Sequence, residues 1–209
     1  TPAELTIDFA SSLQLRLTGT LTGTGVVGTN VDAIPDNAIL TVGPLQVTGT
    51  AGFALTMLTV DADTDGNGTA DLMGATLTGL ALDVSGAGVS IEDVAALQVS
   101  GRLGIATLAP ADVLDTRSWF GLKMGEVTVS GGLDPSLGIQ LSATITIGAL
   151  DYNSATNPTN PTAAKRLDWG RAFDLDGDGA FDDALNPGAG LSTPAELTID
   201  FASSLQLRL

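Results

Sequence analysis

The stretch TPAELTIDFASSLQLRL fills residues 1–17 and returns, letter for letter, at residues 193–209. Its apolar side chains Leu5, Ile7 and Phe9 stand at odd positions, and polar side chains stand between them. Alternation with a period of two is typical of a β-strand with one buried and one solvent-facing side. The stretch therefore predicts a strand that occurs twice.

The distance between the two copies sets the length of the repeat. The copies begin at Thr1 and Thr193, so the period is 193 − 1 = 192 residues. A fixed period marks a repeat protein, and a unit of this length is large enough for its own core. We therefore expect residues 1–192 to be one full unit and residues 193–209 to be the first strand of the next. The chain is then a window cut from a longer array, and an engineered duplication is the alternative explanation.

The same alternation recurs and predicts strands at residues 45–57, 97–105, 127–129 and 139–150. Four glycines inside two of them indicate bulges or bends: Gly49, Gly52, Gly101 and Gly104. Short helical turns are expected at residues 90–97 and 162–169, and the unpatterned stretch NSATNPTNP predicts a surface loop at residues 153–161. The expected fold class is all-β, an elongated tandem repeat forming a β-solenoid-like or continuous β-sheet rod. A string of β-sandwich domains is the alternative.

The composition excludes several classes of function. Asp and Glu total 24 against 8 Lys and Arg, for a net charge of −16, which argues against binding nucleic acid or anionic membrane surfaces. Polar residues interrupt every apolar stretch, so we expect no membrane insertion. Cys and His are absent, which removes the usual nucleophile systems and zinc ligand sets. Catalysis by carboxylates alone stays open, but we do not expect an enzyme and assign no catalytic or cofactor-binding residues.

Two acidic loops carry the strongest chemical pattern, DxDGxGxxD: DTDGNGTAD at residues 63–71 and DLDGDGAFD at residues 174–182. Oxygen ligands at alternate positions of a tight loop, with Gly where φ is positive, are what Ca²⁺ requires. The expected ligands of the first loop are Asp63, Asp65, Asn67, the Thr69 carbonyl and Asp71. Those of the second are Asp174, Asp176, Asp178, the Ala180 carbonyl and Asp182. Asp61 and Asp183 are spare carboxylates, and acidic turns without an ion are the alternative.

These loops differ from an EF-hand because Gly74 and Leu185 stand where its bidentate Glu belongs. They resemble the calcium loops of thrombospondin type 3, dockerin and bacterial adhesin repeats. With strings such as LQVSGRLGIATL and DTRSWFGLK, the chain resembles the giant acidic tandem-repeat surface proteins of aquatic bacteria. The resemblance implies secretion, an extracellular or cell-surface location and a mechanical or adhesive role.

The function expected is that of a structural repeat in a calcium-stiffened extracellular fibre, surface filament or biofilm matrix. Its partner would be itself, head to tail along the array and laterally. The alternatives are the extender region of a giant bacterial adhesin and a carbohydrate-binding module, for which no aromatic or carboxylate cluster is evident. We expect Trp119, Phe120 and Trp169 to fill the core or seal units rather than form a binding platform.

Overall fold

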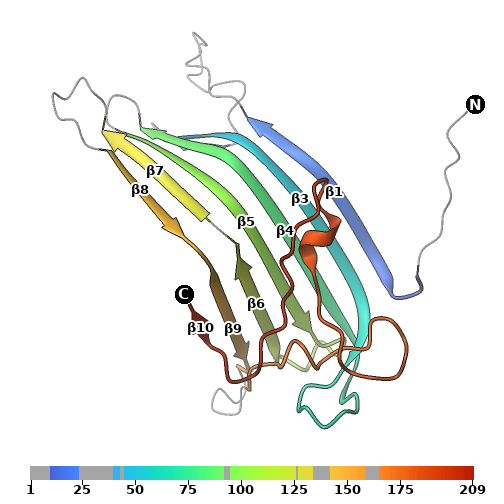
Figure 1. The fold of residues 1–209 in the computed structure, drawn as a ribbon. Coiled ribbons are helices and arrows are strands. Elements are labelled where there is room, and N and C mark those ends of the chain that lie inside the picture. The colour runs from blue at the N-terminus through green and yellow to red at the C-terminus, as the bar shows by residue number, and fades with distance from the viewer. Residues whose placement is uncertain are drawn as a thin grey trace, which may run out of the picture.

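The computed structural model describes residues 10–23, 40–42, 45–91, 95–125, 127–133, 142–158 and 165–209. Within them the strands form one open antiparallel sheet (Figure 1), which confirms the all-β class. The elements are β1 (Leu13–Gly23), β2 (Leu40–Val42), β3 (Leu45–Ala62), β4 (Leu72–Ile91), β5 (Ala95–Ala109), β6 (Ser118–Met124), β7 (Val127–Leu133), β8 (Ser142–Ile147), β9 (Leu150–Thr156), η3 (Pro187–Gly190) and β10 (Leu207–Arg208). The described part of the chain has no helix of the length and apolarity needed to cross a membrane.

The sheet is a meander of long strands in the order β1-β3-β4-β5-β6-β9-β10. β6 and β7 lie one after the other along β5, while β9 pairs with β6 and β8 with β7. β3 and β4 contain 18 and 20 residues, which at about 3.3 Å per residue makes these strands roughly 60 Å long. The strands predicted at residues 45–57, 97–105 and 127–129 are confirmed.

The bulge predicted at Gly49 is confirmed. Gly49 has a φ of 125°, which a residue with a Cβ rarely adopts. The pairing of β3 with β4 shifts register between Thr48 and Thr50. The long strand therefore bends at the glycine that interrupts its alternation.

Gly101 has a φ of 149° and adjoins a second register shift. Gly52 and Gly104 pair in regular register, so the bulges predicted there are wrong.

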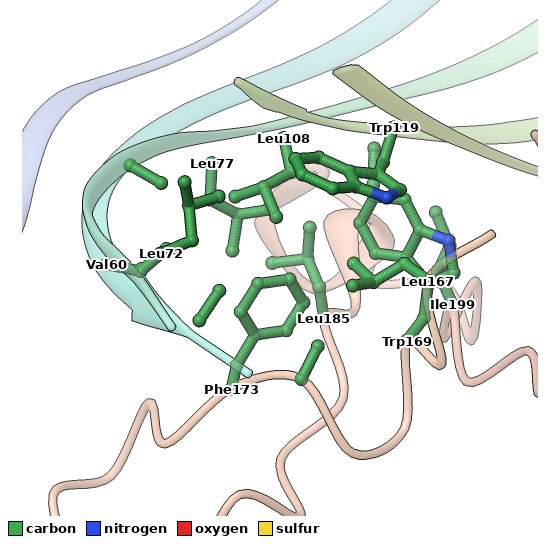
Figure 2. Packing of buried hydrophobic residues seen from close by; sticks show 14 of the residues in the cluster. Val60, Leu72, Leu77, Leu108, Trp119, Leu167, Trp169, Phe173, Leu185 and Ile199 are labelled. Carbon is green, nitrogen blue, oxygen red and sulfur yellow. The ribbon is translucent and has the colours of Figure 1, made fainter. Parts of the chain in front are cut away.

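One face of the sheet is covered by residues 165–209, which run across it mostly as irregular chain (Figure 1). Figure 2 shows the resulting core, where Leu77 and Leu108 from the sheet meet Trp169, Phe173 and Ile199 from the covering segment. All five are fully buried, and each contributes about 2 kcal/mol of hydrophobic stabilisation.

Trp119 and Trp169 belong to this core as predicted, whereas Phe120, predicted with them, is outside it, partly exposed and beside Tyr152. Trp119 is 5% exposed and Trp169 is fully buried. The Trp119 indole N–H donates to the Lys165 carbonyl at 3.0 Å, and the Trp169 indole N–H donates to Asn153 Oδ1 at 3.0 Å. Both side chains thereby attach the covering segment to the sheet.

The opposite face of the sheet carries a row of apolar side chains at one level of the ladder. The row crosses seven strands and every member is at least partly exposed. Its members in order are Leu17, Leu55, Leu80, Ile105, Leu122, Tyr152 and Leu207.

The loop predicted at residues 153–161 is wrong for its first part, because β9 extends to Thr156. Asn153 is fully buried, and its side-chain amide donates to the Leu167 carbonyl at 2.9 Å. The polar residue is inside because the covering segment satisfies its hydrogen bonds. The strand predicted at residues 139–150 is interrupted at residues 148–149, and residues 139–141 lie outside the described residues.

Three further predictions about local structure are wrong in whole or in part. Residues 90–91 and 95–97 belong to β4 and β5 instead of a helical turn, and residues 165–168 are irregular; residues 92–94 and 162–164 lie outside the described residues. In residues 197–209 only Leu207 and Arg208 form a strand, although Leu197, Ile199 and Phe201 are buried alternately. Their backbone groups bond to separate parts of the chain instead of one neighbouring strand. Residues 1–9 of the first copy lie outside the described residues.

Candidate metal centre

The two acidic loops arise from one backbone ladder at one end of the sheet (Figure 1). The first loop connects Ala62 at the end of β3 to Leu72 at the start of β4. Ala62 forms an antiparallel bridge with Phe173, and Phe173 forms another with Asp183. Because Phe173 is also buried in the core, the second loop is anchored to the sheet through the base of the first.

The first Asp of each loop holds the loop closed with its side chain. Asp63 accepts backbone N–H bonds from Gly66 at 2.7 Å and Gly68 at 2.6 Å. Asp174 accepts from the two matching glycines, Gly177 and Gly179, at 2.7 and 3.0 Å. The shared sequence pattern thus produces the same local conformation twice.

The glycines of the pattern are required by the backbone. Gly66 and Gly68 have φ values of 79° and 83°, and Gly177 and Gly179 have φ values of 80° and 90°. L-residues with a side chain are strained in this region. A glycine at each of these positions lets the loop turn tightly enough to direct several side-chain oxygens toward one region.

The middle acidic and amide side chains repeat as well. Asp65 Oδ1 accepts from the Asn67 N–H at 3.1 Å, and Asn67 Oδ1 accepts from the Thr69 N–H at 2.9 Å. The second loop has the same two bonds at 3.1 and 2.8 Å, with Asp176, Asp178 and Ala180 in the corresponding places. These bonds hold the predicted ligand side chains in place, and a ligand role for them and for the Thr69 and Ala180 carbonyls stays a prediction.

The loops differ in the carboxylate that closes them. In the first loop Asp71 accepts from Thr64, through the backbone N–H at 2.6 Å and the hydroxyl at 2.7 Å. In the second loop the Leu175 N–H, at the position equivalent to Thr64, donates to Asp183 at 2.6 Å. Asp183 therefore occupies the place that the sequence pattern gives to Asp182.

A difference in loop length explains why Asp183, and not Asp182, closes the second loop. The first loop spans 71 − 63 = 8 steps from opening to closing Asp, and the second spans 183 − 174 = 9. The backbone supports the same pairing, since the Asp71 N–H donates to the Ala62 carbonyl at 3.0 Å and the Asp183 N–H to the Phe173 carbonyl at 3.1 Å. Asp182 is exposed.

An acidic triad results in the second loop. One carboxylate oxygen from each of Asp174, Asp176 and Asp183 lies within 4.8 Å of the others, so the three together could hold a metal ion. Asp183 belongs to this group although the sequence pattern makes it a spare carboxylate. In the described part of the chain no Lys or Arg lies within ion-pair distance of the triad.

Asp63 in the first loop is deeply enclosed, with 3% of its surface exposed. Burial is the largest influence and by itself raises the pKa of this carboxyl. Several hydrogen bonds to the carboxylate together outweigh burial, so the pKa of Asp63 lies below its ordinary value. The donors are the backbone N–H groups of Gly68, Gly66, Asn67 and Asp65.

Cationic side chains lie beside the first loop. Lys165 and Arg166 line a cavity of about 360 Å³ together with Asp63 and Asp65. A second cavity places Lys165 and Arg117 beside Asp71. Hydrogen bonding to Asp115 raises the pKa of Arg117 most, and the charge of Asp71 raises it further. The first loop therefore has positive charge available from the protein itself.

No family model, curated protein or solved structure matches the chain. The resemblance to acidic surface proteins stays a prediction. Any function assigned to the chain therefore rests on the geometry of its acidic loops and of its repeated segment.

Proposed function

We propose that this chain is a structural repeat of an extracellular fibre, surface filament or matrix, stiffened by calcium. The exact recurrence of residues 1–17 at residues 193–209 carries the proposal. Units that follow one another in a single chain produce an elongated assembly.

Calcium is the ion that best fits the second loop. The group consists of carboxylates only, from Asp174, Asp176 and Asp183, with Asp178 nearby in the same loop. Hard oxygen ligands in a tight, partly exposed loop suit Ca²⁺, whereas Mg²⁺ prefers to keep its waters. The ion would offset the repulsion among these carboxylates and cross-link them.

Such a cross-link would act on the whole unit because of where the loop begins. Phe173 precedes Asp174 and is buried in the core, and its backbone bridges Ala62 of β3. An ion that holds the second loop closed would therefore raise the cost of lifting residues 165–209 from the sheet. Millimolar calcium outside cells is sufficient even for weak sites, which supports the extracellular location.

The adhesin extender is the second candidate function, and the partly exposed apolar row bears on the choice. Contiguous apolar surface on a sheet favours association with another molecule. An extender works as a single rod, whereas a fibre or matrix needs lateral contacts. The row from Leu17 to Leu207 therefore supports the fibre over the extender.

Electron microscopy of a protein with several consecutive units tests the proposal. In about 1 mM calcium we expect straight rods whose length grows in proportion to the number of units and which bundle side by side. Dispersed single rods would favour the extender. Compact particles, or flexible beads that look the same in calcium and EDTA, would contradict the structural role.

A further inference from the structure

The second copy of the repeated segment is seated in a defined site on the sheet. Leu197, Ile199 and Phe201 are each at most 3% exposed. The Ile199 N–H donates to the Leu185 carbonyl at 2.8 Å, and the Trp169 N–H donates to the Phe201 carbonyl at 2.8 Å. The segment is thus held by both apolar contacts and backbone hydrogen bonds.

The sheet surface beneath this segment is shaped for it by glycine. A Cβ added to Gly121 would lie 2.9 Å from Ile199 Cγ2, and one added to Gly104 would lie 3.1 Å from Leu197 Cβ. Both distances are shorter than ordinary carbon contacts. The glycines therefore leave room for the apolar side chains of the repeat.

The end of the second copy pairs with the edge of the sheet. The Asn153 N–H of β9 donates to the Gln206 carbonyl at 3.0 Å. Arg208 Nε donates to Asp151 Oδ2 at 2.6 Å, and the side chain of Asp151 is only 3% exposed. The buried carboxylate at this edge is thus paired with an arginine from the repeated segment.

Residues 10–17 of the first copy have the same local turn but lie at the other edge of the sheet (Figure 1). The Leu13 N–H donates to the Ala10 carbonyl at 3.0 Å, and the matching bond from Leu205 to Ala202 has the same length. Arg16, which matches Arg208, is exposed and forms no ion pair within the described residues.

The two copies use opposite edges of the same strand. The Thr59 N–H donates to the Ser12 carbonyl at 2.8 Å, so backbone groups of Thr59, and of Met57 two residues earlier, face β1. β1 shifts register between Leu13 and Leu15, so the alternation that begins at Ser12 changes there, and Met57 lies opposite Leu15. The backbone groups of Leu15 therefore face β3, and those of Arg16 face away from β3.

In the second copy the other set of backbone groups is used. Gln206 accepts from Asn153 of β9, and Arg208, two residues later, lies opposite Asp151. The backbone groups of Arg208 therefore face β9. Arg208 matches Arg16, whose backbone groups face away from β3. A single strand of this sequence can therefore pair with β3 along one edge and with β9 along the other.

From this geometry we infer a joint between copies of the chain. Residues 1–17 of one copy occupy the site that residues 193–209 fill in another, so that β1 lies between its own β3 and the β9 of the preceding copy. Arg16 then pairs with Asp151 of that copy. In a tandem array residues 193–209 are this strand of the next unit. The joint rests on the proposed structural role and specifies how its units connect.

The register of the joint keeps both faces of the sheet continuous. Tyr152 shares its level with Leu17 of its own unit and pairs directly with Leu207. Leu207 matches Leu15, so successive units are offset by 17 − 15 = 2 residues. A shift by one residue would exchange the two faces, whereas a shift by two preserves them.

The test uses the full chain of 209 residues and the two matched phenylalanines. Phe201→Ala weakens the segment that fills its own site, and Phe9→Ala makes the same change in the first copy. The attached segment acts at an effective concentration of about 1 mM, roughly tenfold above a 100 µM protein solution. Loss of a buried Phe lowers the affinity of the segment by more than about 100-fold, so the intact first copy of another molecule should take its place.

Sedimentation velocity is measured for both variants and for the double variant. At about 100 µM Phe201→Ala should form head-to-tail oligomers, while Phe9→Ala and the double variant stay monomeric. A monomeric, folded Phe201→Ala protein, or equal association of both single variants, would overturn the joint. The runs are made in calcium and in EDTA. Association of Phe201→Ala tests the joint, and the difference between calcium and EDTA tests the calcium effect, so failure of one can be told from failure of the other.

A second measurement covers the case in which Phe201→Ala does not fold alone. The peptide TPAELTIDFASSLQLRL is added in excess and thermal unfolding is followed by circular dichroism. The peptide should restore the unfolding transition, and a peptide with Ala in place of its Phe should not. No restoration by the intact peptide would also overturn the joint.

Discussion

The two acidic loops share a sequence pattern and a backbone conformation but differ in what neutralises their charge. The first encloses Asp63 at 3% exposure and lies beside Lys165 and Arg117. The second brings Asp174 and Asp183 together with one more carboxylate and has no cation within ion-pair distance among the described residues.

The same sequence motif therefore lies in two different electrostatic surroundings. The first loop is largely satisfied by hydrogen bonds and nearby cations, so it stabilises the turn from β3 to β4 without an ion. The second loop has carboxylates close to one another, and in the proposed role a cation would offset their repulsion. We therefore expect calcium to bind the second loop more tightly than the first.

The largest expected effect concerns stability without calcium. Asp63→Asn should lower the free energy of unfolding in EDTA by about 1–3 kcal/mol, because an amide presents one acceptor where the carboxylate uses both oxygens. Asp174→Asn is the matched control in a more exposed loop and should lose less than half as much. Urea unfolding measures both. Equal losses would remove the distinction between the loops.

The next effect concerns the ligand set of the second loop. Asp183→Asn should weaken calcium binding about tenfold, because the number of ligand charges sets affinity. Asp182→Asn, one residue away and exposed, should leave binding within about twofold. Calorimetric titration of each variant measures the change. The reverse ranking would restore the ligand set that the sequence pattern gives and exclude the triad.

The smallest effect sharpens the role of the cations. Lys165→Gln removes a positive charge beside Asp63 and Asp65, and calcium should then bind the first loop about two- to threefold more tightly. Binding at the second loop should not change. Chemical shifts of Gly68 and Gly179 amides report the two loops separately. A weaker first site in this variant would show that Lys165 does not compete with the ion.

Much of the fold follows from the sequence because the strands under the covering segment, such as β4 and β6, bury one face. The alternation from Leu45 to Met57 and the bulge at Gly49 are both readable from residue types alone. The strand predicted for the second copy of the repeat is mostly absent, for a physical reason. Ile199 and Phe201 alternate as in a strand. Their backbone groups, however, bond to Leu185 and Trp169 of the same covering segment, and the Ile199 side chain packs over Gly121, so no single neighbouring strand pairs with them.

Part of the candidate metal site can be predicted from the sequence. The pattern indicates that Asp174 and Asp176 lie in a tight acidic loop. It does not indicate that Asp183 replaces Asp182, because the closing residue depends on the extra residue in the loop and on the bridge to Phe173. The burial of Asn153 could not be predicted for a similar reason. A polar residue in a polar stretch gives no indication that distant groups, here Leu167 and Trp169, form its side-chain hydrogen bonds.

The most direct test of calcium stiffening is the thermal unfolding of the full chain in calcium and in EDTA, with bound metal determined by elemental analysis. A site with a dissociation constant of about 0.1 mM stabilises the fold by about 1.4 kcal/mol at about 1 mM calcium. For a protein of this size the melting temperature should rise by about 3–6 °C, and calcium should be present in the folded protein. An unchanged melting temperature together with no bound calcium would contradict the central claim that calcium stiffens this repeat.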